Sequence, residues 1–257
     1  MKRQKRNKMK KFGLIGFPLT HSFSKKYFTE KFEKEGMDYC LYENYPIVSV
    51  ESLPQLIDSE PDLAGLNVTI PYKEEVLQYL DEVNPEAKEI GAINTIKIAK
   101  INGSKRLIGY NTDVYGFRKP LEEVLKPVHA KALILGTGGA SKAVAWVLKE
   151  LGISYSFVSR NPKTSKDLSY ESLSDEIIRE NLILINTSPV GMYPDIMEAP
   201  KLPYYGLTSN HILYDLVYNP EKTSFLRKGE EKKATLINGL PMLYLQAEKA
   251  WEIWNQE

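Results

Sequence analysis

The sequence contains very little cysteine and histidine. Cys40 is the single cysteine among 257 residues, and the three histidines, His21, His129 and His211, stand at unrelated positions. One cysteine cannot form an intrachain disulfide, and the scattered histidines lack the spacing of a zinc or other transition-metal site. We therefore expect a protein without structural disulfides and without a bound metal.

Long apolar runs are also missing. No stretch approaches the ~20 consecutive apolar residues that a membrane-spanning helix needs, and no apolar signal-peptide core follows the N-terminus. Hydrophobic residues make up 42% of the chain and charged residues 26%, which is ordinary for a globular protein. We expect a cytoplasmic protein with no membrane partner.

The formal net charge of +1 hides an uneven distribution, because five positive residues lie within the first eight positions. A basic leader of this kind can bind nucleic acid or anionic lipid. A disordered tail, or a start codon upstream of the Met9 at which the protein would otherwise begin, is the simpler interpretation. We predict that residues 1–10 are a disordered leader and that no nucleic acid is bound.

Apolar runs alternate with helical patterns along most of the chain, which is typical of α/β proteins. In the first part the pattern predicts strands at residues 12–17, 39–45 and 64–70, and a helix at 22–35 that Ser22 caps. Pro71 suits the first turn of a further helix. Residues 92–99 and 106–110 flank Asn102 and Gly103, a strong hairpin signal. A hairpin makes this sheet mixed rather than purely parallel.

The second part has the same alternation. A connecting helix is expected at residues 113–125, and a further helix at 141–151. Buried strands are expected at 132–135, 155–159, 181–185 and 212–216. A last helix is expected at residues 238–254.

A glycine-rich turn separates the first strand and helix of the second part. Gly136 to Ser141 (GTGGAS) follows a strand and opens a helix, the setting in which glycines let the backbone approach a pyrophosphate. The next strand ends at Ser159 and Arg160 without the acidic residue that an NAD site normally places there. A guanidinium suits a 2′-phosphate, and Lys163 can add charge. These residues predict NADP.

Polar clusters follow the strands of the first part. Ser22 and Ser24 follow the first strand, and Asn67 and Thr69 share one face of a strand by the two-residue period. Lys73 is expected in the first turn of the next helix, where a cation opposes the helix dipole. Further along, Asn94 and Asp113 lie in the polar fragments GAINT and GYNTD.

Together these fragments resemble the shikimate dehydrogenase family, from about Lys11 to the last helix. Eight fragments occur in the family order: IGFPLTHSFS, GLNVTIPYKE, GAINTI, GYNTDVYGF, LGTGGASKAV, INTSPVGM, YDLVYNPEKTSF and NGLPMLYLQA. The chain departs from the family pattern at Lys25, where proline is usual, and at Tyr110, where an acid is frequent. After Arg160 it also lacks the usual second basic residue at its expected spacing.

The resemblance implies a role for each matching residue. Lys73 and Asp113 form the implied catalytic pair. The implied substrate carboxylate ligands are Ser22, Ser24 and Tyr218, and the implied ligands of the ring substituents are Asn67, Thr69, Asn94 and Gln246. The implied cofactor residues are Gly136, Thr137, Gly138, Gly139, Ala140, Ser159, Arg160, Asn186, Thr187, Leu216 and Gly239.

We therefore expect an α/β protein with two domains. Residues 11–112 with 238–257 are expected to form a mixed-sheet substrate domain, completed by the C-terminal helix. Residues 113–237 are expected to form a Rossmann-type NADP-binding domain. The expected reaction is the NADPH-dependent reduction of 3-dehydroshikimate to shikimate, by a monomer or a homodimer. Lys73 then serves as proton carrier or as electrostatic stabiliser of the reacting oxygen.

Three alternatives stay open. One is a quinate/shikimate dehydrogenase that accepts NAD, which the missing second basic residue after Arg160 keeps in play. Another is a non-catalytic, dinucleotide-binding regulatory relative, against which the presence of both Lys73 and Asp113 argues. The third is a different two-domain NADP enzyme, such as one acting on folates.

Overall fold

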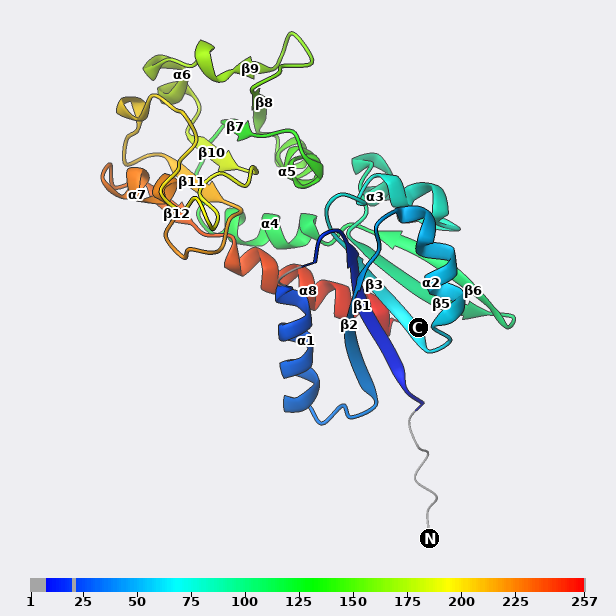
Figure 1. Cartoon of the computed structure of the whole chain (residues 1–257). Coiled ribbons are helices and arrows are strands. Elements are labelled where there is room, and N and C mark those ends of the chain that lie inside the picture. Colours follow the sequence, from blue (N-terminus) through cyan, green and yellow to red (C-terminus); the bar gives the residue numbers. More distant parts are fainter. Residues whose placement is uncertain (1–7, 20–21, 257) are drawn as a thin grey trace. The chain divides into compact units, whose positions relative to one another are not determined.

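The computed structural model describes residues 8–19 and 22–256. The prediction for the basic leader therefore lies mostly outside the described residues. The chain forms two compact units, one running to Thr112 and resuming at Ala247, the other Asp113–Gln246 (Figure 1). Within the described part of the chain, no helix is long and apolar enough to cross a membrane.

The first unit contains a six-stranded mixed sheet, as the hairpin signal predicted. The strand order is β2-β1-β3-β5-β6-β4, with β1 parallel to β2 and β3, and β5 antiparallel to β3 and β6. The strands are β1 Lys10–Gly16, β2 Cys40–Pro46, β3 Leu63–Val68, β4 Glu82–Val83, β5 Thr95–Ile101 and β6 Ser104–Tyr110. Asn102 and Gly103 turn the chain with φ of 51° and 84°, the left-handed conformation that a two-residue hairpin loop requires.

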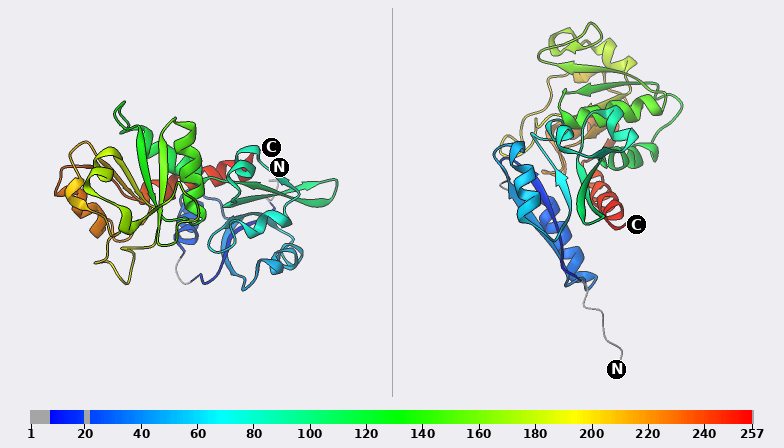
Figure 2. Two further views of the ribbon diagram at one scale, coloured as in Figure 1. Left: turned by 90° about the horizontal axis from the view of Figure 1, so that it is seen from above. Right: turned by 90° about the vertical axis from the view of Figure 1, so that its right-hand side faces the viewer.

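Helices cover both faces of this sheet (Figure 2). Alternation along β1 sends Phe12 to one face, where it packs with Phe28 and Trp254, and Ile15 to the other, where it packs with Leu53. The first face is covered by α1 and the end of α8, and the second by α2 and the short helices. The elements are α1 Phe23–Lys34, η1 Val50–Ser52, α2 Leu53–Ser59, η2 Glu75–Tyr79 and α3 Pro85–Ile90.

The predicted N-cap of α1 is confirmed, but the helix predicted to open at Pro71 is wrong. The Ser22 side chain accepts a hydrogen bond from the Lys25 N–H at 3.1 Å. After β3 the chain instead forms turns as far as Glu74, and only a 3₁₀ helix, η2, follows. The Lys73 carbonyl accepts the Ile93 N–H at 2.6 Å, so this distant partner takes the place of an intrahelical donor. Lys73 thus stands in a turn, where no helix dipole opposes its charge.

The second unit is a parallel six-stranded sheet of the Rossmann type. The strand order is β12-β11-β10-β7-β8-β9, and each neighbouring pair is parallel. This order reverses direction at β7, the switch point at which doubly wound sheets bind ligands. The strands are β7 Lys131–Leu135, β8 Ser154–Ser159, β9 Leu168–Ser169, β10 Ile183–Asn186, β11 Ile212–Asp215 and β12 Thr235–Ile237.

Helices lie on both faces of the second sheet as well. Leu133 and Leu213 pack with Ile178 of α6 and Phe225 of α7. On the opposite face Tyr214 stacks on Phe117 of α4, with ring centroids 4.8 Å apart. The helices are α4 Asp113–Glu122, α5 Gly139–Glu150, η3 Tyr170–Ser172, α6 Asp175–Glu180, η4 Tyr204–Gly206 and α7 Ser224–Glu230.

The last helix, α8 Leu240–Asn255, belongs to both units, because the division falls between Gln246 and Ala247. The sequence pattern predicted that the chain returns to the first domain at residue 238, the expected start of this helix. Asn238 is the residue that starts α8, since its Oδ1 accepts the Leu240 N–H at 2.8 Å. A single unbroken helix gives no local signal of the point at which its packing partners change.

Candidate functional site

Two predicted substrate residues, Asn67 and Asn94, lie together at one end of the first sheet. Both are almost fully buried. The Asn67 Nδ2 donates to the Asn94 carbonyl at 3.3 Å and to the Thr95 Oγ1 at 3.2 Å. Buried amides need such partners, and here the partners fix which way each amide faces.

The same cluster fixes the backbone beside both predicted catalytic residues. The Asn94 Oδ1 accepts the Thr112 N–H at 2.7 Å, and the Asn94 Nδ2 donates to the Thr112 Oγ1 at 3.0 Å. Thr112 directly precedes Asp113. On the other side of Asn94, the Ile93 N–H holds the Lys73 carbonyl. One dipeptide, Ile93-Asn94, therefore restrains the main chain at Lys73 and immediately before Asp113.

Tyr42 is a residue of this cluster that the sequence analysis did not identify. Its hydroxyl donates to the Asn67 Oδ1 at 2.8 Å, and its ring stacks on Phe28 with centroids 4.7 Å apart. Burial raises the pKa of Tyr42, and the Ser24 hydroxyl offsets part of that shift by hydrogen bonding to the phenol. Tyr42 thus connects two predicted substrate residues, Ser24 and Asn67. The alternation of β2 marks it as inward-facing, but nothing in the sequence gives its partner.

The remaining predicted site residues of the first unit lie in segments next to β1 and β3, and Ser24 reaches this cluster through Tyr42. Ser22, just before α1, and Ser24, in the first turn of α1, are both half-buried. Thr69 follows β3, and its N–H donates to the Ile15 carbonyl at 3.0 Å, which holds the chain beside Gly16. Lys73 is half-buried. The first unit therefore supplies six of the predicted residues. They lie after β1, at the end of β3, after β3, and directly before β5.

In the second unit the glycine turn has the predicted strand–turn–helix setting. Gly136 has φ of +119°, which favours glycine, and α5 begins at Gly139. No side chain caps the start of α5 at Gly138, and a Cβ at Gly138 would meet no atom within 4 Å. Thr137 and Gly138 are exposed. The first N–H groups of α5 are thus presented from an uncrowded turn, as binding of a pyrophosphate requires.

Thr187, which follows β10, lies beside this turn, and Leu216 and Gly239 follow the neighbouring strands β11 and β12. Thr187 donates through both its N–H and its Oγ1 to the Leu135 carbonyl, at 3.1 and 3.0 Å. A Cβ at Gly136 would lie 2.9 Å from the Thr187 Oγ1. Leu216 donates its N–H to the Asn186 carbonyl at 2.9 Å, and Gly239 packs directly on the Leu216 carbonyl. The fold therefore gathers residues from four loops at the carboxyl edge of the sheet.

Arg160 extends from the end of β8 and is exposed. The Ser159 Oγ accepts the Asn161 N–H at 3.1 Å and shapes the turn that carries Arg160. Farther on, one oxygen of Asp167 accepts the N–H groups of Lys163 and Thr164, each at 2.9 Å. These backbone hydrogen bonds hold the pKa of Asp167 below its ordinary value. The loop after Arg160 is therefore closed by Asp167, which the sequence analysis did not single out.

Asp113 and Gln246 come from two helices that pack closely within the second unit. A Cβ at Gly116 would lie 2.6 Å from the Met242 carbonyl and 3.3 Å from the Gln246 Cβ, so α4 and α8 meet there at backbone distance. Asp113 is buried one turn before Gly116, and residues three apart share one face of a helix. Tyr218 is half-buried in the loop after β11.

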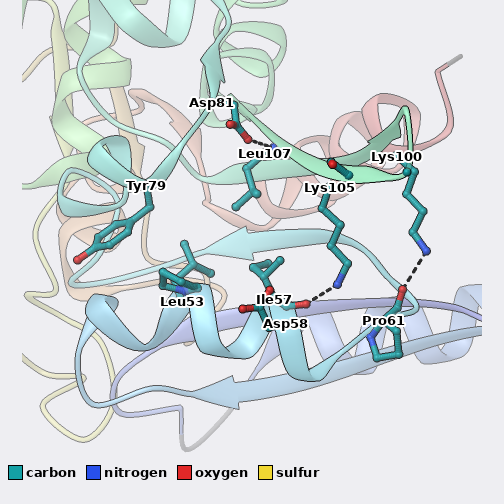
Figure 3. Close-up of a pocket in the computed structure, with 12 residues that line it drawn as sticks. Leu53, Ile57, Asp58, Pro61, Tyr79, Asp81, Lys100, Lys105 and Leu107 are labelled. Carbon is teal, nitrogen blue, oxygen red and sulfur yellow. Dashed lines mark hydrogen bonds between the residues drawn. The ribbon is translucent and has the colours of Figure 1, made fainter.

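A pocket elsewhere in the first unit contains none of the predicted site residues (Figure 3). This pocket, of about 690 Å³, lies between α2 and the β5–β6 hairpin. Its lysines already have partners: Lys105 donates to the carbonyls of Ile57 and Glu60, and Lys100 donates to the Pro61 carbonyl at 3.0 Å. The Asp81 carboxylate accepts the Leu107 N–H at 2.7 Å. The lysine contacts join the hairpin to α2 and the residues that follow it, and the Asp81 contact joins the hairpin to the segment before β4.

Comparison with known proteins adds independent evidence. Residues 14–96 match the profile of the shikimate dehydrogenase substrate binding domain. A shikimate dehydrogenase (NADP(+)) of Carboxydothermus hydrogenoformans is 40% identical, over 94% of this chain and 90% of its own length. The chain belongs to the shikimate dehydrogenase family.

Solved structures of family members have the same fold. Shikimate dehydrogenase from Aquifex aeolicus is 34% identical with a TM-score of 0.82, covering 96% of this chain and 92% of its own. Shikimate 5-dehydrogenase from Thermus thermophilus, in complex with NADP(H) and shikimate, also is 34% identical with a TM-score of 0.82, covering 96% and 94%. The predicted two-domain α/β fold with a Rossmann-type sheet is thereby confirmed.

Proposed function

We infer that this protein is an NADP-dependent shikimate dehydrogenase, which reversibly reduces 3-dehydroshikimate to shikimate. The observation that carries this function is 40% identity, over nearly the whole chain, to a relative named shikimate dehydrogenase (NADP(+)). A related structure of this family was solved with both NADP(H) and shikimate. The reaction serves the shikimate pathway, which supplies aromatic amino acids.

The residues of the second unit fit a dinucleotide. When bound, NADPH supplies the hydride that reduces the ring ketone. The uncapped start of α5 and the open turn at Gly138 suit the pyrophosphate. We propose that Arg160 binds the 2′-phosphate, because it is exposed at the end of β8, where an NAD-specific site would carry an acid. Asn186, Thr187, Leu216 and Gly239 are proposed to line the remaining length of the cofactor.

The substrate residues are proposed to divide by chemistry. Ser22 and Ser24 carry hydroxyl donors suited to a carboxylate, and Tyr218 is proposed to join them. Since the Ser22 oxygen already accepts the Lys25 N–H, its hydrogen remains available for an anion. Asn67, Thr69, Asn94 and Gln246 are proposed to bind the ring hydroxyls, because amides and hydroxyls can both donate and accept.

Lys73 and Asp113 are proposed as the catalytic pair. An alkoxide is too basic to be left without a proton, so a donor must stand at the reacting oxygen. The Lys73 ammonium can give that proton, or it can stabilise negative charge on the oxygen as the hydride arrives. Asp113 is proposed to accept hydrogen bonds from the reacting hydroxyl and from the ammonium, and so to orient both.

We also propose that the enzyme works in the cytoplasm as a monomer or homodimer, without nucleic acid. Its substrates are small and dissolved, and the nicotinamide dinucleotide that it uses belongs to the cell interior. A quinate/shikimate dehydrogenase accepting NAD and a non-catalytic relative are the alternatives, and the names of the relatives favour neither.

The test follows NADPH absorbance after shikimate and NADP⁺ are added to the purified full-length protein. A rate that requires both compounds supports the proposal, and parallel assays with quinate and with NAD⁺ measure selectivity. Comparable rates with quinate and NAD⁺ would assign the first alternative. No turnover, combined with tight dinucleotide binding, would assign the second.

A further inference from the structure

A buried carboxylate that no role above uses joins the ends of β10 and β11. Asp215 is the last residue of β11, is fully buried, and pairs in register with Asn186 of β10. Its Oδ1 accepts the Asn186 Nδ2 at 2.9 Å and the Val217 N–H at 3.0 Å. Its Oδ2 accepts the Thr223 Oγ1 at 2.5 Å. Only an ionised carboxylate can accept three donors on two oxygens without itself donating.

Asn186 extends this restraint into the turn after β10. Its Oδ1 accepts both the N–H and the Oγ of Ser188, at 3.1 and 2.7 Å, and its Nδ2 also donates to the Val190 carbonyl at 3.2 Å. Thr187 lies inside this closed turn, against Gly136. The conformation of the turn at Thr187 therefore depends on an asparagine that Asp215 orients.

The segment after β11 depends on the same carboxylate. The Val217 N–H bond fixes the backbone directly after Asp215, and Leu216 between them donates its N–H to the Asn186 carbonyl at 2.9 Å. On the far side, Thr223 also accepts the Leu226 N–H at 3.3 Å as the N-cap of α7, so its own hydrogen is free for the carboxylate. Asp215 thus connects two loops and the start of a helix.

We propose that Asp215 is a positioning residue for the dinucleotide, acting through Asn186 and Leu216 to set the edge on which the cofactor rests. This inference rests on the proposed function. Asp215 need not touch the cofactor. In its ionised state it holds the cofactor-binding edge of the sheet in one arrangement, a role that the family resemblance does not assign. A neutral, protonated Asp215 carries a hydrogen on one oxygen, which makes that oxygen a weaker acceptor and adds a donor that needs a partner of its own, so the hydrogen bonds from its three donors are weakened or rearranged.

The surroundings of Asp215 make its ionisation sensitive to pH near neutrality. Burial raises the pKa of Asp215 to about 6, against the opposing effect of its hydrogen bonds from Thr223, Val217 and Asn186. Tyr204 is a titratable residue near Asp215 among the described residues. Burial and the Asp215 charge raise the pKa of Tyr204 away from neutrality, so Tyr204 does not change charge in this pH range. The Lys228 Nζ lies 5.0 Å from the centre of the Tyr204 ring.

The experiment measures NADPH affinity by nicotinamide fluorescence between about pH 5 and pH 8.5, for the wild type and for Asp215→Asn. At about pH 7.5 the variant is expected to bind NADPH about fivefold to tenfold more weakly, the loss of one buried hydrogen bond. KM for NADP⁺ should rise more than kcat falls. Wild-type affinity should decline as pH falls through about 6, and the variant should lack this part of the decline.

The 2′-phosphate of the cofactor also titrates near pH 6, as phosphate monoesters do. This contribution is common to both proteins, so the difference between their two curves isolates Asp215. Asp81→Asn, which removes a carboxylate that accepts one backbone N–H in the first unit, controls for the loss of one charge. It should leave NADPH affinity and its pH dependence unchanged.

Equal NADPH affinity at pH 7.5, or identical pH curves for wild type and Asp215→Asn, would overturn the proposal. If Asp215→Asn does not fold, Thr223→Val and Thr223→Ser decide instead. Thr223→Val removes one donor and should move the pH midpoint upward, whereas Thr223→Ser should behave as the wild type; any other pattern counts against Asp215. A wild-type protein that neither binds NADPH nor oxidises shikimate would instead refute the proposed function.

Discussion

Tyr42 donates its phenolic hydrogen to the Asn67 Oδ1 across 2.8 Å, and both residues are almost completely buried. Because the Asn67 Nδ2 already donates to the Asn94 carbonyl, the amide can present only its oxygen to the phenol. The hydrogen bond therefore has one direction. A side chain on the edge strand β2 thus orients a substrate residue on β3, two strands away in the sheet.

Tyr42→Phe is expected to raise KM for shikimate about threefold to tenfold with a smaller change in kcat, because Asn67 loses one of its restraints. Steady-state kinetics at saturating NADP⁺ measures this. The matched control is Tyr72→Phe, which removes a hydroxyl bonded to the Ile47 carbonyl at 2.6 Å in the same unit. Equal KM changes in both variants would reduce the role of Tyr42 to general stability.

Lys73→Ala should lower kcat by about 10²-fold to 10⁴-fold, the usual contribution of a proton-transfer group. NADPH affinity, measured by fluorescence, should stay near the wild-type value. Lys88→Ala removes an exposed cation of the same unit and serves as the control. Near-normal turnover in Lys73→Ala would show that another group supplies the proton.

The double variant Ser22→Ala with Ser24→Ala should mainly raise KM for shikimate, because it removes donors to the carboxylate in the ground state. Ser22 is also the N-cap of α1, so the melting temperature should fall by the equivalent of about 1 kcal/mol. Ser174→Ala removes the comparable cap of α6, where Ser174 accepts the Ile177 N–H at 3.3 Å. A collapse of kcat with KM unchanged would contradict an anchoring role for the serines.

Arg160→Ala should weaken NADP⁺ binding at least about tenfold while changing NAD⁺ binding little, because only NADP⁺ carries the 2′-phosphate. The ratio of kcat/KM for the two cofactors gives the result directly. Arg179→Ala, at an exposed arginine of α6, is the control. Parallel losses for NADP⁺ and NAD⁺ would place Arg160 outside the phosphate site.

The stability of the protein should depend on Asp215 in a defined pH range. Its pKa rises from 3.8 in the unfolded chain to about 6 in the folded protein, chiefly by burial. Folding therefore favours the protonated carboxyl, and this favourable contribution is complete below about pH 4 and lost as pH rises through about 6.

Chemical denaturation of Asp215→Asn and wild type should show this titration. The free energy of unfolding of the variant, relative to wild type, should increase by up to about 3 kcal/mol between pH 4 and pH 7 and then stay constant. A relative stability that does not change over this range would mean that Asp215 does not titrate there. Weaker cofactor binding together with higher stability at pH 7 would fit a carboxylate kept for function.

The elements that could be predicted from the sequence are those with local causes. The Asn102-Gly103 turn determines its hairpin because both residues must adopt positive φ. Ser22 caps α1 because its side chain reaches an N–H only three residues away. The glycine turn at Gly136 is recognisable because the strand before it and the helix after it are contiguous in sequence.

The helix predicted at Pro71 failed for the opposite reason. Proline favours a first turn, but the Lys73 carbonyl is taken by Ile93, twenty residues later in the chain. For a similar reason, the importance of Tyr42 and Asp215 could not be predicted from the sequence. Each is an ordinary buried residue of a strand, and its importance depends on partners in other strands and loops, such as Asn67 and Thr223.

The sequence by itself determined the two alternating patterns, the glycine turn and the set of polar fragments that identify the family. These features depend on short-range sterics and on the chemistry of residues adjacent in the chain. Only the tertiary structure decided which of those polar groups share hydrogen bonds. The register of β1, β3 and β5 brings Asn67 beside Thr95, and that of β10 and β11 brings Asn186 beside Asp215. Strand pairing joins residues remote in the chain, and no local pattern specifies it.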